Sequence, residues 1–178
     1  MPNGEPSLDE LLARWPGDDP LLAAADGNGL IGHRGSLDRP VPLASITKPL
    51  VSTAVWMAIE EGVLELDGPV DDPHVDPSVT VRHLLAHASG LGPERGDPVG
   101  PPERRRVYSN AGFELLGRLL SRSSGMSVTD YLREGVLDPL GMTSTALPGS
   151  PAHGATGTGG DLARWVSEML APALLHAD

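Results

Sequence analysis

The chain has 178 residues, of which 39% are hydrophobic and 21% charged, and this predicts a single globular domain over residues 1–178. Its formal net charge of -11 argues against nucleic acid or an anionic membrane as a partner, because both bind basic surfaces. The absence of cysteine excludes disulfides, thiol catalysis and cysteine metal sites.

The first ten residues have neither the basic region nor the apolar region of a secretory signal peptide. No apolar run along the chain approaches the length needed to span a membrane. We therefore expect a soluble, cytoplasmic protein. Leu8–Trp15 is predicted to form one or two turns of helix, ended by Pro16-Gly17.

A β-hairpin is predicted next, with strands at Leu21–Ala25 and Gly29–His33 on either side of a short polar turn. The same segment matches Gly-x-Gly-x-x-Gly over residues 27–32, a pattern found in dinucleotide sites. That pattern needs a helix immediately after it, whereas Pro40 and Pro42 follow here. A dinucleotide site is therefore excluded.

The segment Ser45–Glu61 is predicted to be the central helix of the fold. It carries no charge between Lys48 and Glu60, and most of its sides are apolar. A helix without a charged face is a buried one, and Gly62 supplies its end.

The rest of the chain alternates helices with loops, and no internal repeat is visible. One predicted helix has leucines on one face and charged residues spaced by four on the other. Together, the predicted elements are helices at Val79–His87, Ala111–Arg122, Val128–Gly135 and Leu162–Leu170, with a long surface loop at Leu91–Arg106.

Lys48 is the only lysine, and the other twelve basic residues are all arginine. Arginine keeps its proton at any pH that a protein tolerates, whereas a desolvated lysine can lose it. The single titratable amine lies three residues after Ser45, on the same face of a helix. This pair matches Ser-x-x-Lys, a nucleophile motif.

A serine hydroxyl becomes a good nucleophile only when a neighbouring base takes its proton. The positive end of the helix dipole and burial both favour the neutral form of Lys48, which can act as that base. The same dipole stabilises negative charge developing at Ser45. In the ordinary alternative, Ser45 caps the helix and Lys48 is a solvated surface residue.

A second motif, Tyr-x-Asn, stands directly before the Ala111 helix, at Tyr108-Ser109-Asn110. A tyrosine at this place can share a proton with Ser45 and Lys48, and an asparagine amide can orient the lysine or a substrate carbonyl. The alternative is that Ser109 or Asn110 caps the helix and that Tyr108 is a half-buried aromatic residue.

These motifs, in this order, resemble the serine β-lactamase-like family of class C β-lactamases, DD-peptidases and related esterases. The segment His83–Leu91 lies between them, and the resemblance runs from about Pro40 to Trp165. Leu140–Thr145 is similar to the family's Leu-Gly-Met-x-x-Thr segment, and Asp161–Trp165 to its Asp-Leu-Ala-Arg-aromatic helix.

The resemblance implies that Ser45 is acylated, that Lys48 and Tyr108 manage the proton, that Asn110 supports them, and that water releases the acyl group. It also implies an α+β fold: a helix-rich β-lactamase/transpeptidase-like architecture in which an antiparallel sheet packs against helices, with an all-helical lobe beside it.

One departure concerns the family's third motif, His- or Lys-x-Gly, which belongs on a strand well beyond the Asp161 helix. The sequence ends at Asp178, shortly after that helix, and Gly157-Thr158-Gly159 lacks the basic residue. We therefore expect an N-terminal portion of the family fold, without its final strands and one oxyanion donor. It would be a truncation, half of a split enzyme or a degenerate relative.

Two further groups of charged or titratable residues could have a function of their own. His83 and His87 are four residues apart, but they lack the Glu of His-Glu-x-x-His and a third ligand. We expect them to be packed, hydrogen-bonded structural residues, and we expect no metal and no cofactor. Arg104–Arg106 is expected to be a solvated loop, and steering of anionic substrates remains the alternative.

The sequence thus predicts a serine hydrolase that forms an acyl-enzyme at Ser45 and acts on small esters, amides or lactams. The alternative is a catalytically incompetent binding or remnant domain, or half of a split enzyme that another chain completes. Unpaired sheet edges would in either case favour self-association or a complementing chain.

Overall fold

The computed structural model describes residues 7–15 and 19–176, so the first residues and the Pro16-Gly17 stop lie outside it. The first helix, α1, spans Leu8–Leu12 and ends three residues earlier than predicted. Ser7 begins it with a capping box, because its hydroxyl accepts from the Glu10 N–H while the Glu10 carboxylate accepts from the Ser7 N–H.

The predicted central helix is present, but it starts with a tighter turn. Ala44–Ile46 forms a 3₁₀ turn, η1, and the α-helix α2 follows at Thr47–Glu60. Burying a Val or Leu side chain stabilises a fold by roughly 1.5–3 kcal/mol. The fully buried apolar side chains of α2 are Leu50, Val51, Ala54, Val55 and Ala58, which confirms its core position. Neither α2 nor another helix in the described ranges is long and apolar enough to cross a membrane.

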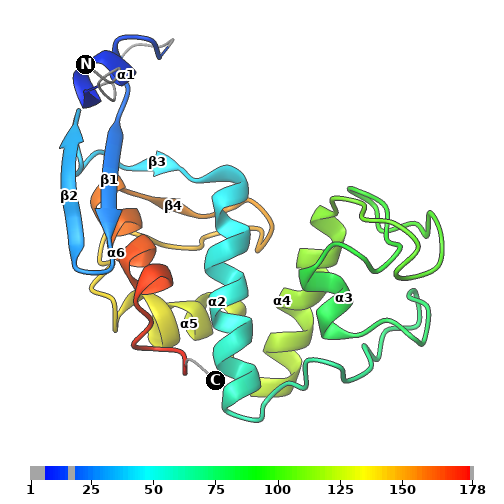
Figure 1. Ribbon diagram of the computed structural model, residues 1–178. Helices are drawn as coiled ribbons and strands as arrows, with labels where there is room; N and C mark the ends of the chain where they lie inside the picture. Colours follow the sequence, from blue (N-terminus) through cyan, green and yellow to red (C-terminus); the bar gives the residue numbers. More distant parts are fainter. Residues whose placement is uncertain (1–6, 16–18, 177–178) are drawn as a thin grey trace.

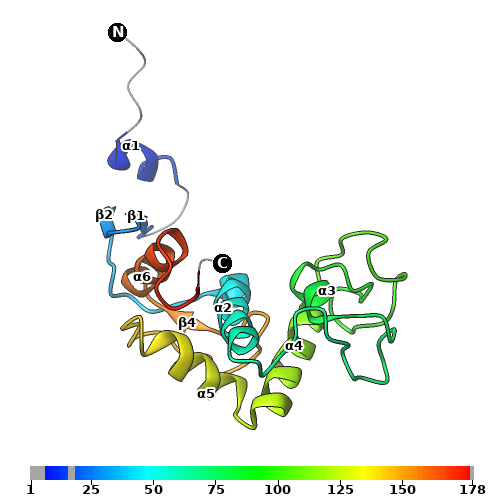
Figure 2. The same ribbon diagram turned by 60° about the horizontal axis from the view of Figure 1, so that its bottom comes forward.

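α2 stands between two groups of elements (Figure 1). On one side lie the hairpin strands β1 (Leu22–Asp26) and β2 (Gly29–Arg34) with helix α6 (Gly159–Leu170). On the other side lie α3 (Val81–Leu85), α4 (Asn110–Ser124) and the long loops around them. The tilted view in Figure 2 shows the same separation, with α6 between the hairpin and α2.

The hairpin confirms the predicted antiparallel pair. β1 and β2 form a two-stranded sheet with an irregularity between Ala24 and Ala25, and the Asn28 N–H donates to the Asp26 carboxylate (2.8 Å) within the turn. α6 packs against β1. The apolar face predicted for this helix is not wholly covered, because Met169 and Leu170 at its end are 37% and 60% exposed.

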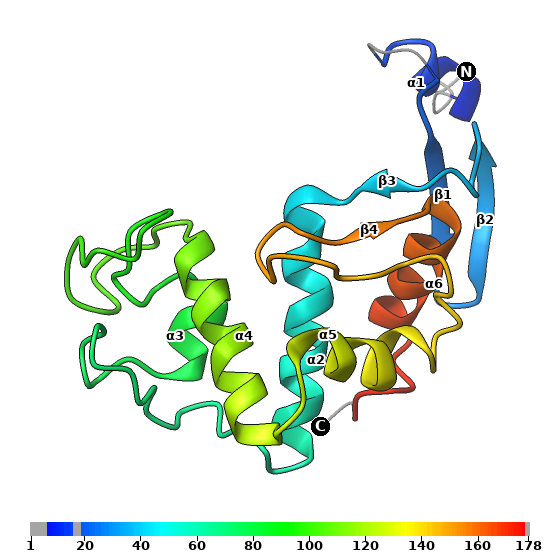
Figure 3. The same ribbon diagram turned by 180° about the vertical axis from the view of Figure 1, so that it is seen from behind.

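A second, very short sheet was not predicted. β3 (Val41–Pro42) pairs antiparallel with β4 (Thr156–Gly157), and the two run side by side in Figure 3. The pairing continues past β3, where the Leu43 N–H donates to the Ala155 carbonyl (2.9 Å). It therefore brings the residues before β4 to the start of α2, where Ser45 lies.

The helical part follows the predicted pattern closely. α4 buries Leu115, Leu116, Leu119 and Leu120, and its C-cap is Gly125, whose φ of 73° is left-handed. α3 is shorter than predicted. The Leu91–Arg106 loop contains neither helix nor strand, although Leu91 and Pro98 form an isolated bridge. α5 (Val128–Leu132) continues into a π turn, η2 (Arg133–Leu137).

Two segments that the resemblance singled out are joined by a buried carboxylate. One Asp161 oxygen accepts from both the Ser144 N–H (2.9 Å) and the Thr145 hydroxyl (2.8 Å). Asp161 is 6% exposed, and Thr158 caps its helix. The Leu140–Thr145 segment is thereby fastened to the first turn of α6.

We expect Asp161→Ala to lower the free energy of unfolding by about 2 kcal/mol, because two partly or fully buried donors lose their acceptor. The control is Asp138→Ala, which removes only an exposed ion pair with Arg133 and is expected to cost less than about 1 kcal/mol. Urea denaturation measures both. Equal losses in the two variants would contradict a structural role for the Asp161 carboxylate.

Candidate active site

Ser45 lies on a backbone turn that hydrogen bonds to a distant segment of the chain stabilise. Ala44, directly before it, has a left-handed φ of 47°, which is unfavourable for a residue with a Cβ atom. The Thr47 hydroxyl donates to the Ala44 carbonyl (2.7 Å) and accepts from the Ala155 N–H (3.0 Å). Ser45 itself is exposed. The surrounding contacts therefore maintain an unfavourable turn that presents a serine to solvent.

Lys48 is buried beside this turn, and the ordinary alternative for the Ser45–Lys48 pair is wrong on both points. The N-cap of α2 is Ile46, with no side-chain capping bond, and Lys48 is only 4% exposed. The Lys48 amine donates to the Asn110 side-chain carbonyl (2.6 Å) and to the Ala152 backbone carbonyl (2.9 Å). It is thus held by two segments distant in sequence.

In the Tyr-x-Asn motif, Ser109 and Asn110 make different contacts. Ser109 is the N-cap of α4: its hydroxyl accepts from the Gly112 N–H (3.0 Å) and donates to the Gly92 carbonyl (2.7 Å). Asn110 is therefore not needed as the cap, and its amide bridges Lys48 to the Glu94 carboxylate (2.8 Å). The capping alternative holds for Ser109 alone.

Tyr108 completes the cluster. The centre of its ring lies 4.5 Å from the Lys48 amine and 4.7 Å from the His87 ring, and the residue is 49% exposed. Hydrogen bonding by Lys48, and next by Ser45, lowers the pKa of the Tyr108 phenol below its ordinary value of 10.0. Burial and the Glu94 charge act in the opposite direction. The structure therefore brings Ser45, Lys48, Tyr108 and Asn110 together, and hydrogen bonding favours ionisation of the Tyr108 phenol.

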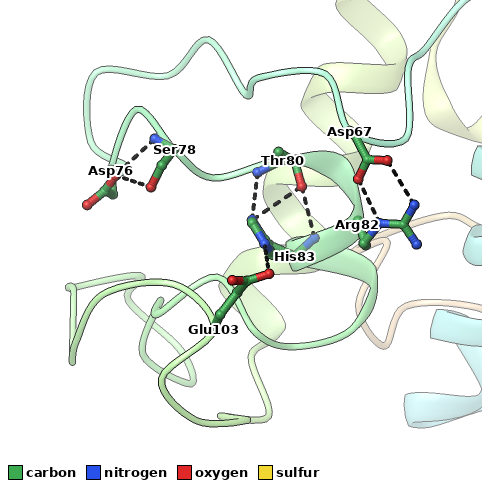
Figure 4. A network of polar contacts seen from close by, with 7 residues as sticks. All are labelled: Asp67, Asp76, Ser78, Thr80, Arg82, His83 and Glu103. Carbon is green, nitrogen blue, oxygen red and sulfur yellow. Dashed lines mark hydrogen bonds and ion pairs between the residues drawn. The ribbon is translucent and has the colours of Figure 1, made fainter.

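The two histidines have protein partners, as expected. The His83 ring accepts from the Thr80 N–H (3.1 Å) and contacts Glu103 (3.0 Å) through its other nitrogen, as Figure 4 shows. His87 accepts from the Ser109 N–H (3.1 Å), and its pKa is lowered by burial first and then by the charges of Arg106 and Lys48. In the described part of the chain, no three potential metal-ligating side chains come together.

Several groups around the site were not predicted from sequence. The Ala152 carbonyl is a backbone group, so no residue type in the sequence indicates that it contacts Lys48. Glu94 lies within a loop that was assigned to the surface, and nothing in that loop marks it as a partner of Asn110. Glu114, by contrast, carries a signal, because it follows Asn110 by four residues and so shares a face of α4 with it.

Two pockets in the described part of the chain are not lined by Ser45. One of about 630 Å³ lies between the β1–β2 turn and the start of α6. Another of about 290 Å³ lies beside α4, where Glu94 and Glu114 contribute to its wall. Arg104–Arg106 is exposed, as predicted. The candidate nucleophile is itself exposed at the surface.

A tyrosine titration tests this electrostatic arrangement, since the chain has only two tyrosines. Burial first, and then a hydrogen bond to Glu61, raise the pKa of Tyr131, so Tyr108 is expected to ionise in a separate, earlier step. Lys48→Met is predicted to move the earlier step to higher pH, because the main group stabilising the phenolate is lost. Ultraviolet absorbance of tyrosinate against pH measures both steps.

Glu61→Gln is the matched control for the titration. It is expected to move the later step to lower pH and to leave the earlier step in place, because Glu61 contacts only Tyr131 of the two phenols. An earlier step that stays unchanged in Lys48→Met would show that Lys48 does not act on Tyr108.

Known proteins are similar to this chain in sequence and in fold. Penicillin-binding protein 4* of Bacillus subtilis is 30% identical over 167 residues, covering 70% of this chain and 37% of that protein. Lovastatin esterase of Penicillium rubens is 25% identical, covering 61% and 38%. The crystal structure of a β-lactamase from Mycobacterium bovis is 41% identical with a TM-score of 0.89, covering 96% of this chain and 62% of that one.

The chain thus spans about two fifths of the length of these two curated relatives. The resemblance inferred from the motifs is confirmed over most of the sequence, because the model of the family described as Beta-lactamase matches residues 22–176. The predicted fold class is confirmed as well, since similar solved structures have the β-lactamase fold. The chain belongs to the β-lactamase family.

Proposed function

We propose that this chain is a serine hydrolase that forms an acyl-enzyme at Ser45, with Lys48 and Tyr108 as proton-transfer partners. The observation that carries the proposal is the buried Lys48 amine, which lies between Asn110 and the Tyr108 ring beside an exposed serine. A cluster of titratable groups built around a potential nucleophile is the usual setting of covalent catalysis.

In the first step, the Ser45 oxygen attacks the carbonyl carbon of an ester or amide, and its proton passes to the Tyr108 oxygen or to the Lys48 amine. The tetrahedral intermediate then expels the alcohol or amine, which takes that proton as it leaves. In the second step, water attacks the acyl group and gives its proton to the same base, and Ser45 is released as the alcohol.

The negative oxygen of the tetrahedral intermediate needs donors. The Ser45 N–H donates no hydrogen bond to the described residues, so it is free to serve as one such donor. It also lies next to the start of α2, where the positive end of the helix dipole stabilises an anion. A second donor would raise the rate by roughly a hundred- to a thousand-fold.

Small esters, amides or lactams are the substrates we favour. Ser45 is exposed, and relatives that share this family include an esterase and penicillin-binding proteins. Because the chain spans only part of their length, completion by another chain, self-association and a remnant without activity are the other outcomes that the experiment must separate. The expected cytoplasmic location remains a prediction.

Intact-mass spectrometry after exposure to a fluorophosphonate tests the proposed function. We predict one adduct on the parent chain, none on Ser45→Ala, and one on Ser52→Ala, which removes a hydroxyl from α2 outside the cluster. Tyr108→Phe is expected to lower the rate of adduct formation by about a hundred-fold, because a proton-transfer partner is lost.

A folded parent chain that forms no adduct would contradict the proposed function and favour a binding or remnant domain. If the adduct instead appears only after a second chain is added, the site is completed by that partner. Circular dichroism on each variant shows that the fold is retained.

A further inference from the structure

The turn formed by residues 150–155 is held by one serine. The Ser150 hydroxyl accepts from the Ala152 N–H (3.0 Å), and the Ser150 carbonyl accepts from the N–H groups of His153 (3.2 Å) and Gly154 (2.7 Å). Both peptide groups that flank Ala152 are therefore bonded to Ser150. Ala152 itself is fully buried.

This arrangement aims the Ala152 carbonyl at Lys48. The carbonyl of Ala152 and the N–H of His153 belong to one planar peptide group, and in a trans peptide they point in opposite directions. With the N–H bonded to the Ser150 carbonyl, the oxygen faces the Lys48 amine at 2.9 Å. The position of Ser150 thus determines where Lys48 finds its acceptor.

Ser150 is in turn bonded to α4. Its hydroxyl donates to the Glu114 carboxylate, and a hydroxyl bonded to a charged acceptor forms a stronger hydrogen bond than one bonded to a neutral group. Pro151 also packs closely on Gly117, where a Cβ atom would lie 2.8 Å from its ring. Glu114 and Gly117 therefore fix the turn against the helix.

The same helix supplies the other acceptor of Lys48. Asn110 is four residues before Glu114, so the two side chains leave α4 on one face, one turn apart. Asn110 contacts the Lys48 amine directly, and Glu114 reaches it through Ser150 and Ala152. α4 thus sets the position of both oxygens that hold the amine.

We propose that Glu114 is a positioning residue: through Ser150 it holds the Ala152 carbonyl on Lys48 and so keeps the amine within reach of Ser45 and Tyr108. This inference deepens the proposed function and rests on it. Glu114→Gln retains a side-chain oxygen that can accept from Ser150, whereas Glu114→Ala leaves the hydroxyl without its acceptor.

The first test observes Lys48 directly and needs no reaction at Ser45. Because Lys48 is the only lysine, protein labelled with lysine that carries ¹³C only at Cε gives a single lysine Cε resonance. Glu114→Ala and Ser150→Ala are expected to move this resonance in the same direction, and the double variant is expected to move it no further. Arg118→Ala, one turn along α4 and exposed, is the control and is expected to leave it in place.

The second test measures the rate of fluorophosphonate adduct formation at Ser45. Each single variant is expected to lower it by roughly ten-fold, since even a 1 Å displacement can cost about a hundred-fold. The double variant is expected to be no slower than either one, because both changes break the same connection. Glu114→Gln is expected to recover most of the loss.

A Lys48 resonance that stays at the parental position in folded Glu114→Ala and Ser150→Ala would overturn the positioning role. Rate losses that multiply in the double variant would do the same. A parent chain that forms no adduct would contradict the proposed function instead, and the resonance would still decide whether Glu114 positions Lys48. Should Glu114→Ala fail to fold, Ser150→Ala breaks the same path.

Discussion

A lysine amine taken out of water must find hydrogen-bond acceptors, or its burial costs several kcal/mol. Lys48 meets this requirement with Asn110 and the Ala152 carbonyl, which come from α4 and from the turn before β4. Neither acceptor is near Lys48 in sequence. Burial of Lys48 therefore requires that three segments lie together. These segments are the start of α2, the start of α4 and the turn of residues 150–155.

The turn at Ser45 depends on the same arrangement. Thr47 is bonded to Ala44 on one side and to Ala155 on the other, so the segment that supplies an acceptor to Lys48 also stabilises the left-handed residue before Ser45. Exposure of the serine and burial of the lysine thus have a common cause. Ser45 and Lys48 are only three residues apart, yet one is exposed and the other is buried. This difference arises from the segments that pack around them rather than from their spacing along the chain.

Sequence patterns predicted the parts of the fold that are long and periodic. The apolar run of α2, the leucine face of α4 and the hairpin strands all follow from residue spacing. β3 and β4 contain two residues each, which is too short for a pattern. At the site, spacing and motif order identified the side chains that meet. The spacing of Glu114 from Asn110 indicates only a shared face of α4. Its contact with Ser150 and the position of the Ala152 carbonyl could not be predicted, because tertiary packing alone creates them.

The central claim is that Lys48 exchanges a proton with Ser45 and Tyr108, and Lys48→Arg tests it most directly. Arginine keeps a positive charge and hydrogen-bond donors but does not give up its proton. Our account predicts that folded Lys48→Arg reacts with a fluorophosphonate about a hundred-fold or more slowly than the parent, as slowly as Lys48→Met. A rate close to the parental one would show that Lys48 acts only as a fixed charge, and it would contradict the account.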